Sequence, residues 1–234
     1  MSKNWLLGLD SLAQLPCPEL LQAHRKHVSL VIEKCHWIGS VLLKHFSSSL
    51  RLGQAMDLEG SHRYGEPSTS ALGLLKYPMP VSTSGQLGQI AHTDVGSITV
   101  LFSQLGGLQV LGQNDEWLFV EPKPGHAVIN VGDSLRFLTG GVLRSSLHRV
   151  VSHPDALQQP RYSIAYFMRP EYDARFEAED GVQWTGLGWH TRKFVVFRAS
   201  AEEQKASAVL TGRKGYLGLW ESEKSGATCD VPTT

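Results

Sequence analysis

Hydrophobic positions in the first third of the chain recur at steps of three and four residues. After Pro16 and Pro18, the stretch from Glu19 to about Ser49 carries apolar side chains at this spacing. Such steps place side chains on one side of a helix, so the pattern predicts one or two amphipathic helices, with Gly39 as the candidate break. Residues 51–70 are rich in Gly, Ser, His and Arg, which favours a loop.

Between residues 71 and 169 the pattern changes to short apolar runs separated by Gly, Pro and Asp. The candidate strands are Leu72–Tyr77, Ile98–Gln104, Leu108–Leu111, Trp117–Val120, Ala127–Val131, Leu147–Val151 and Tyr162–Met168. Many short strands with turn signals between them predict a sandwich or barrel, and a double-sheet jelly roll suits this number. We therefore expect a mainly β fold with flanking helices.

The last part of the chain gives mixed signals. Asp180-Gly181 and Gly186-Leu187-Gly188 predict loops, Ala199–Leu210 predicts a helix, and Glu221–Thr234 predicts a mobile tail. We accordingly divide the chain into an N-terminal helical segment (1–70), a jelly-roll core (71–175) and a C-terminal lid or helical region with a flexible tail (176–234).

Composition narrows the class of protein only a little. The 234 residues are 41% hydrophobic and 19% charged, with a formal net charge of zero. This is ordinary for a globular protein and gives no sign of a nucleic-acid partner, so we expect a small-molecule partner. No run of about 18 apolar residues predicts a membrane span. The cysteines Cys17, Cys35 and Cys229 are odd in number and scattered, which predicts free thiols and a cytoplasmic protein.

The first candidate for chemistry is His92-Thr93-Asp94 together with the distant His148. Residues two apart in a strand share a face, so His92 and Asp94 are expected to point the same way. His148, in another predicted strand, could join them. Two imidazoles and one carboxylate leave coordination positions open, as non-haem iron(II) requires. The triplet alone is weak evidence, since His153-Pro154-Asp155 repeats it beside a strand-breaking proline.

A second candidate is Arg161-Tyr162-Ser163, thirteen residues after His148. Arg161 and Ser163 share one strand face, and a guanidinium beside a hydroxyl suits a carboxylate ligand. An arginine that points into a barrel is costly without an anion, although a solvated edge position with a salt bridge is the competing interpretation.

Together these residues resemble a known family, the 2-oxoglutarate and iron(II)-dependent dioxygenases, and within it the isopenicillin N synthase-like branch. The resemblance covers roughly Pro18 to Asp173 and keeps the order and approximate spacing of the family's motifs. These motifs are Leu74-Leu75-Lys76-Tyr77-Pro78, His92–Phe102, Gly107–Val110, Trp117, Val120-Glu121-Pro122, Pro124-Gly125, Val128–Asp133, Ser145–Val150 and Arg161–Phe167.

The resemblance implies a double-stranded β-helix core, the jelly roll of cupin-like proteins, and a role for each matched residue. His92, Asp94 and His148 would be the iron(II) ligands. Arg161 and Ser163 would bind the distal carboxylate of 2-oxoglutarate, and Tyr77 would add its hydroxyl. The resemblance further implies dioxygen as the oxidant, ascorbate as an optional cofactor, and release of succinate and carbon dioxide. It also implies that the substrate is a small molecule of secondary metabolism.

For other residues of the matched region the role is less specific. Phe167 falls where the family often places an aromatic against the substrate, although an aromatic at a strand end also serves the core. Asn130, Gly132 and Asp133 are expected to shape a turn, and His126 to be structural.

The chain also departs from the family's usual pattern. It carries less sequence before its predicted helices, so we expect a less covered pocket and an exposed apolar patch that favours a partner or self-association. Leu75 stands where many relatives have a polar residue. Trp184, Trp189 and Trp220 could line a hydrophobic lid, although ordinary packing is the simpler interpretation.

Three functions remain open at this point. The first is hydroxylation, desaturation or ring formation with 2-oxoglutarate. The second is an iron oxidase that needs no 2-oxoglutarate, in which Arg161 and Ser163 hold the substrate's own carboxylate. The third is a shortened, non-catalytic ligand-binding homologue. A zinc hydrolase built on the same three ligands is disfavoured, because it would give Arg161 and Ser163 no function. Substrate identity and oligomeric state stay open.

Overall fold

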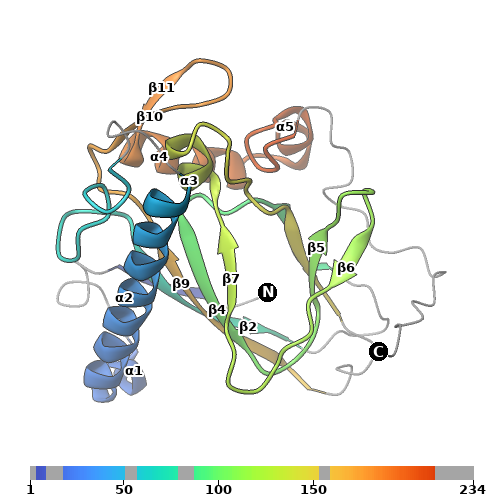
Figure 1. Cartoon of the computed structure of the whole chain (residues 1–234). Helices are drawn as coiled ribbons and strands as arrows, with labels where there is room; N and C mark the ends of the chain where they lie inside the picture. Colours follow the sequence, from blue (N-terminus) through green and yellow to red (C-terminus); the bar gives the residue numbers. More distant parts are fainter. Residues whose placement is uncertain (1–3, 9–17, 51–56, 79–86, 153–158, 214–234) are drawn as a thin grey trace.

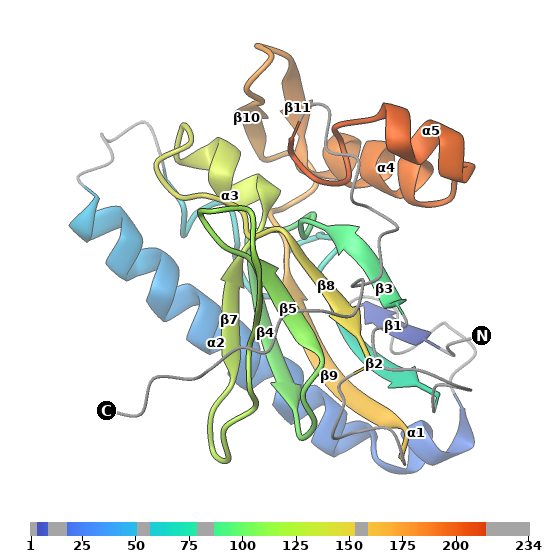
Figure 2. The same ribbon diagram turned by 90° about the vertical axis from the view of Figure 1, so that its right-hand side faces the viewer.

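The computed structural model describes residues 4–8, 18–50, 57–78, 87–152 and 159–213. Two antiparallel sheets face one another in this part of the chain (Figures 1 and 2). The five-stranded sheet has the order β1-β2-β9-β4-β7, formed by Asn4–Gly8, Ala71–Tyr77, Arg161–Met168, Ile98–Ser103 and Val128–Val131. The four-stranded sheet has the order β3-β8-β5-β6, formed by Leu87–His92, His148–Val151, Leu108–Leu111 and Trp117–Phe119. This double-sheet arrangement confirms the predicted jelly roll.

Strand β9 is the central strand of the larger sheet and contributes side chains to both faces of that sheet. Its side chains alternate between the space inside the jelly roll and the opposite face, as the two-residue period of a strand requires. On the opposite face lies α2 (Arg25–Ser49), preceded by the short α1 (Glu19–Ala23) (Figure 1). There the Tyr166 hydroxyl bonds His36 Nδ1 at 2.9 Å, and Gly39 lies against Met168. The helix and the strand thus close the apolar core on that side.

The expected break at Gly39 is wrong. The helix breaks at His24 and then runs unbroken through Gly39, which is buried. A Cβ at position 39 would come within 2.4 Å of Met168 Sδ, so glycine is needed there for close packing rather than for flexibility.

One end of the jelly roll is covered by later elements of the chain (Figure 2). They are α3 (Asp133–Leu138), the ribbon of β10 (Arg175–Glu177) and β11 (Gln183–Thr185), α4 (Gly186–Phe197) and α5 (Ala201–Ala206). Trp189 of α4 is buried and lies edge-on to Phe137 of α3, with ring centroids 5.0 Å apart. Packing is therefore the role of Trp189, and Trp184 also lies edge-on to it, with ring centroids 5.8 Å apart. Trp220 lies outside the described residues.

The seven predicted strands are all present, with ends that differ by no more than a residue or so. The prediction lacked strands β1, β3, β10 and β11 and helices α3 and α4. Gly186-Leu187-Gly188 is not a loop but the first turn of α4, where the Thr185 side chain caps the helix by accepting from the Gly188 amide. The helix expected over Ala199–Leu210 is shorter, and a capping box between Ser200 and Glu203 starts it.

The remaining expectations concern the cysteines, the exposed apolar surface, membrane spans and the domain boundaries, and the structure tests only some of them. Cys35 is free and buried, whereas Cys17, Cys229, His153-Pro154-Asp155 and Glu221–Thr234 lie outside the described residues. Helix α2 exposes apolar side chains, among them Leu30 and Trp37, the latter 64% exposed. None of the helices within the described ranges has the length and apolarity to cross a bilayer. The division at residues 70 and 175 stays a prediction.

Candidate active site

Three side chains with metal-binding atoms meet inside the jelly roll. His92 ends β3 and pairs across the small sheet with His148, the first residue of β8. Asp94 Oδ1 lies 3.8 Å from His92 Nε2 and 3.9 Å from His148 Nε2. One ligand atom from each residue lies within 4.8 Å of the others. The sequence therefore predicted the right three neighbours, although Asp94 lies beyond the end of the strand and not on it.

The second nitrogen of each imidazole is already engaged. His92 Nδ1 donates to the Ile90 carbonyl at 2.7 Å, and His148 Nδ1 donates to the Ser146 carbonyl at 3.0 Å. These bonds select the tautomer in which Nε2 is a lone-pair donor, the usual arrangement of metal-binding histidines. Two nitrogens and one oxygen on one side of a metal suit non-haem iron(II), so the residues fit that ion.

The Asp94 carboxylate is fixed by its second oxygen. Oδ2 accepts from Thr99 Oγ1 at 2.6 Å and from Asn130 Nδ2 at 2.8 Å, which leaves Oδ1 toward the histidines. The expectation that Asn130 shapes a turn is wrong, because Asn130 lies within β7 and its amide points into the pocket. No sequence signal distinguished this asparagine from the turn residues that follow it.

The electrostatics favour the protonation states that bind a metal. Burial and the neighbouring His148 lower the pKa of His92 to about 3, so its imidazole is neutral at pH 7. Burial opposes ionisation of Asp94, but His148 and His92, together with the bonds from Asn130 and Thr99, outweigh it and bring its pKa to about 2. Neutral imidazole and ionised carboxylate are the forms that coordinate cations.

Arg161 and Ser163 line the same cavity from β9. Both are buried, and Arg161 Nη1 donates to Ser163 Oγ at 3.3 Å while Nε donates to the Gly106 carbonyl at 2.9 Å. Tyr77 pairs with Arg161 across β2 and β9, and the guanidinium lies 5.2 Å from its ring centroid. Burial lowers the Arg161 pKa. Within the described ranges no carboxylate pairs with Arg161, which leaves it suited to a carboxylate ligand.

The cavity that joins these groups has a volume of about 340 Å³. Both sheets line it, and most of its wall is apolar, including Leu75, Leu101 and Val110. Phe167 of β9 lies on this wall, as does Phe194 of α4. His126 is exposed outside the cavity, with its Nδ1 on the Pro124 carbonyl at 2.9 Å.

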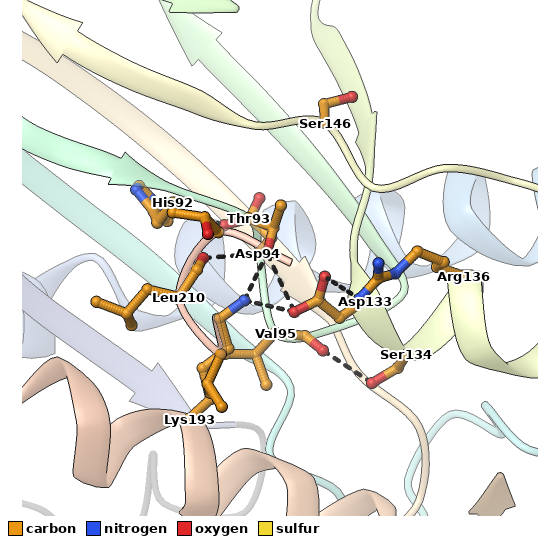
Figure 3. A network of polar contacts seen from close by, with 12 residues as sticks. His92, Thr93, Asp94, Val95, Asp133, Ser134, Arg136, Ser146, Lys193 and Leu210 are labelled. Atoms are coloured by element: carbon orange, nitrogen blue, oxygen red, sulfur yellow. Dashed lines mark hydrogen bonds and ion pairs between the residues drawn. The ribbon is translucent and has the colours of Figure 1, made fainter. Parts of the chain in front are cut away.

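A buried ion pair supports the turn that carries His92 and Asp94 from behind (Figure 3). Lys193 of α4 bonds the Asp133 carboxylate and donates to Thr93 Oγ1 at 2.7 Å, and Thr93 lies between His92 and Asp94. The Thr93 amide also donates to the Leu210 carbonyl at 2.8 Å. The expected turn role of Asp133 is wrong, because it is the fully buried first residue of α3. Gly132, also expected in a turn, is the N-cap of that helix.

Lys193 had no sequence signal. A lysine in a stretch with a weak helical pattern is ordinarily solvated, and only the fold brings it beside Asp133, sixty positions away.

A jelly roll with a two-histidine, one-carboxylate cluster inside it defines the class of non-haem iron oxygenases. The family model of the 2OG-Fe(II) oxygenase superfamily matches residues 68–170. The 2-oxoglutarate-dependent dioxygenase iboH of Amanita muscaria is 45% identical over 181 residues, which cover 76% of this chain and 87% of that protein. The 2-oxoglutarate-dependent dioxygenase frbH of a Dothideomycetidae species is 41% identical over 193 residues, 82% of this chain and 60% of that protein.

Solved structures agree with these relatives. A full-length Neurospora crassa protein in complex with alpha-KG superposes with a TM-score of 0.70 at 25% identity, covering 84% of this chain and 65% of that one. A 2OG-Fe(II) oxygenase family protein of Caulobacter crescentus gives 0.70 at 26% identity, covering 85% and 70%. The chain belongs to the 2OG-Fe(II) oxygenase superfamily. It is a 2-oxoglutarate-dependent dioxygenase that uses Fe(II), 2-oxoglutarate and dioxygen on a small organic molecule.

Proposed function

We propose that His92, Asp94 and His148 hold the iron(II) of this oxygenase, and that Arg161, Ser163 and Tyr77 bind the distal carboxylate of 2-oxoglutarate. The observation that carries the proposal is the convergence of two free Nε2 atoms on Asp94 Oδ1. The other heteroatoms of the three side chains are already hydrogen-bonded.

Each of these groups has a defined task. Fe(II), 2-oxoglutarate and dioxygen, when bound, supply the oxidising chemistry, with release of succinate and carbon dioxide. Thr99 and Asn130 keep Asp94 ionised and orient its free oxygen. Arg161 provides a charge-assisted fork for the co-substrate, and the Tyr77 ring beneath it excludes water.

The apolar wall is the proposed substrate site. Phe167 is one of its rings, and the volume of about 340 Å³ suits a small molecule. Hydroxylation, desaturation and ring formation remain the candidate reactions, and a role in secondary metabolism is part of the proposal. The free thiol of Cys35 and the zero net charge support a cytoplasmic location without a nucleic-acid or membrane partner.

The test is anaerobic addition of iron(II) and then 2-oxoglutarate, followed by visible absorption. The proposal expects a charge-transfer band that requires both additions and that is weaker in Arg161→Ala. The matched control is Arg144→Ala, because Arg144 does not line the pocket. Iron binding without a band would instead favour an oxidase that needs no 2-oxoglutarate. Failure to bind iron would favour a non-catalytic ligand-binding protein.

A further inference from the structure

A second arginine lies in the same pocket. Arg169 follows β9 directly and lines the cavity, although only 6% of its surface is exposed. Arg161 and Arg169 stand at opposite ends of the strand, roughly 26 Å apart along the backbone at the usual rise per residue. Arg169 therefore does not belong to the Arg161–Ser163 site.

Among the residues that the structure describes, no anionic side chain pairs with the Arg169 guanidinium. Its Nη1 donates to the Thr69 carbonyl, and its Nε is buried without a hydrogen-bond acceptor. Within the described ranges no carboxylate lies at ion-pair distance from it. Burial lowers the Arg169 pKa to about 10, but Asp94 opposes this, so the side chain stays charged at neutral pH. A buried cation without a partner is costly, and a bound anion would remove that cost.

The cavity wall as a whole carries an excess of positive charge. Its ionised side chains are Asp94 and the three arginines Arg161, Arg169 and Arg198. Iron(II) and the dianion of 2-oxoglutarate cancel one another, so the loaded pocket still has two positive charges in excess. Arg198, which ends α4, is exposed at the edge of the pocket. Charge balance therefore calls for an anion besides 2-oxoglutarate.

The structure holds Arg169 in place. Ser70 Oγ accepts from the Arg169 amide at 3.0 Å and donates to its carbonyl at 3.1 Å. The guanidinium lies 5.3 Å from the Phe167 ring centroid and 5.8 Å from that of Phe194. Gly96 leaves room for the stem, since a Cβ there would come within 2.6 Å of Arg169 Cγ. A fixed cation between two aromatic rings is a preorganised receptor for an acid with an apolar body.

We propose that Arg169, assisted by Arg198, binds a carboxylate of the substrate, so that the substrate is an organic acid with an apolar or aromatic body. The inference rests on the proposed function, in which Arg161 is occupied by 2-oxoglutarate. Phe167, Phe194 and Phe197 form the aromatic part of the wall that would contact this body.

The experiment measures binding of matched acid and amide pairs to the full chain, loaded anaerobically with iron(II) and saturating 2-oxoglutarate. The probes are benzoate, phenylacetate, 3-phenylpropionate and 4-phenylbutyrate, each compared with its primary amide by calorimetry. Saturating 2-oxoglutarate keeps the probes away from Arg161. A charge-assisted hydrogen bond favours the best acid over its amide by roughly ten- to a hundredfold.

The variants are Arg169→Gln, Arg169→Lys and Arg198→Gln. Arg169→Gln is expected to abolish the acid preference and to leave 2-oxoglutarate affinity unchanged, which also shows that the variant is folded. Arg169→Lys keeps the charge and should retain part of the preference. Arg198→Gln, at the exposed edge, should reduce it by a few fold.

Three results would overturn the inference. One is a wild-type protein that shows no preference for any acid over its amide. Another is an Arg169→Gln protein that keeps the preference. The third is a loss of 2-oxoglutarate affinity in Arg169→Gln as large as the loss of acid binding, which would assign Arg169 to the co-substrate. Absence of the iron and 2-oxoglutarate absorption band in the wild type would instead contradict the proposed function.

Discussion

Replacement of Lys193 by Met should destabilise the protein strongly. The Lys193 and Asp133 side chains are both 0% exposed and form an ion pair behind the turn that carries His92 and Asp94. Methionine keeps most of the length of the side chain, and within the described part of the chain the Asp133 carboxylate then retains the Thr93 hydroxyl at 3.1 Å and Arg136 at 3.6 Å. Loss of one partner of a buried pair costs about 3–5 kcal/mol in the free energy of unfolding.

The double variant Lys193→Met with Asp133→Asn tests the origin of that cost. It also removes the carboxylate that has lost its lysine partner, so its stability should lie within about 1–2 kcal/mol of the wild type. Urea unfolding of the metal-free protein measures all four members of the cycle. For a chain of this length, the single lysine variant should melt roughly 6–20 °C lower.

Iron affinity provides a second readout of the same pair. Thr93 receives a bond from Lys193 and separates two of the proposed ligands, so Lys193→Met should also weaken iron(II) binding, by about tenfold. The reasoning is refuted if the lysine variant loses less than about 1 kcal/mol, or if the double variant is as unstable as the sum of the single ones.

Three other predictions concern the co-substrate, acid stability and packing. Arg161→Gln should raise the dissociation constant of 2-oxoglutarate about ten- to a hundredfold, because a buried charge-assisted contact is lost. His62 is buried and its pKa falls to about 4, chiefly by burial. At this group the unfolded chain binds more protons between about pH 4 and 6.5, so His62 contributes a rise in stability of roughly 3 kcal/mol across that range. His62→Gln should remove this contribution and leave that of His92, whose pKa is lowered as well. Gly96→Ala should cost about 3 kcal/mol or more, since its Cβ would meet the Met168 carbonyl at 2.5 Å, whereas Gly39→Ala displaces only a side chain and should cost less.

Each of these predictions has a direct check. Calorimetric titration of 2-oxoglutarate into Arg161→Gln should be paired with Arg144→Gln, and equal effects would contradict a specific role for Arg161. Urea unfolding at several pH values compares wild type with His62→Gln, and identical slopes would exclude His62 as a titrating group. Equal losses of stability in Gly96→Ala and Gly39→Ala would contradict the distinction between backbone and side-chain clashes.

The site could be predicted from the sequence where short-range rules apply. His92 and Asp94 are close in sequence, and Arg161 and Ser163 follow the alternation of a strand. The motif order then linked them to His148, which the fold brings to within 3.9 Å of Asp94. Strand runs in the core were equally clear, because apolar residues dominate them.

Other parts depended on contacts that sequence spacing does not reveal. Strand β3 was not predicted because Gly and Gln interrupt its short sequence, Leu-Gly-Gln-Ile-Ala-His. Helix α4 begins with two glycines, which ordinarily indicate a loop, and its start depends on the Thr185 cap. Nothing in the sequence marks Lys193 and Arg169 as buried, since burial of a charge is decided by the fold around it.

Strand β9 constrains how this pocket could change in evolution or in engineering. Positions 161, 163, 165, 167 and 169 all line the cavity, while Tyr166 and Met168 between them pack toward α2. Insertion of one residue between the two arginines would turn the positions on one side of it to the opposite face, so that one of the two arginines would leave the pocket. An insertion of two would keep every position on its face but lengthen the strand by about 7 Å between the two arginines. New substrate preferences are therefore accessible through single substitutions at the odd-numbered positions of β9. Changes in the length of this strand preserve the pocket only when two residues are inserted or deleted together.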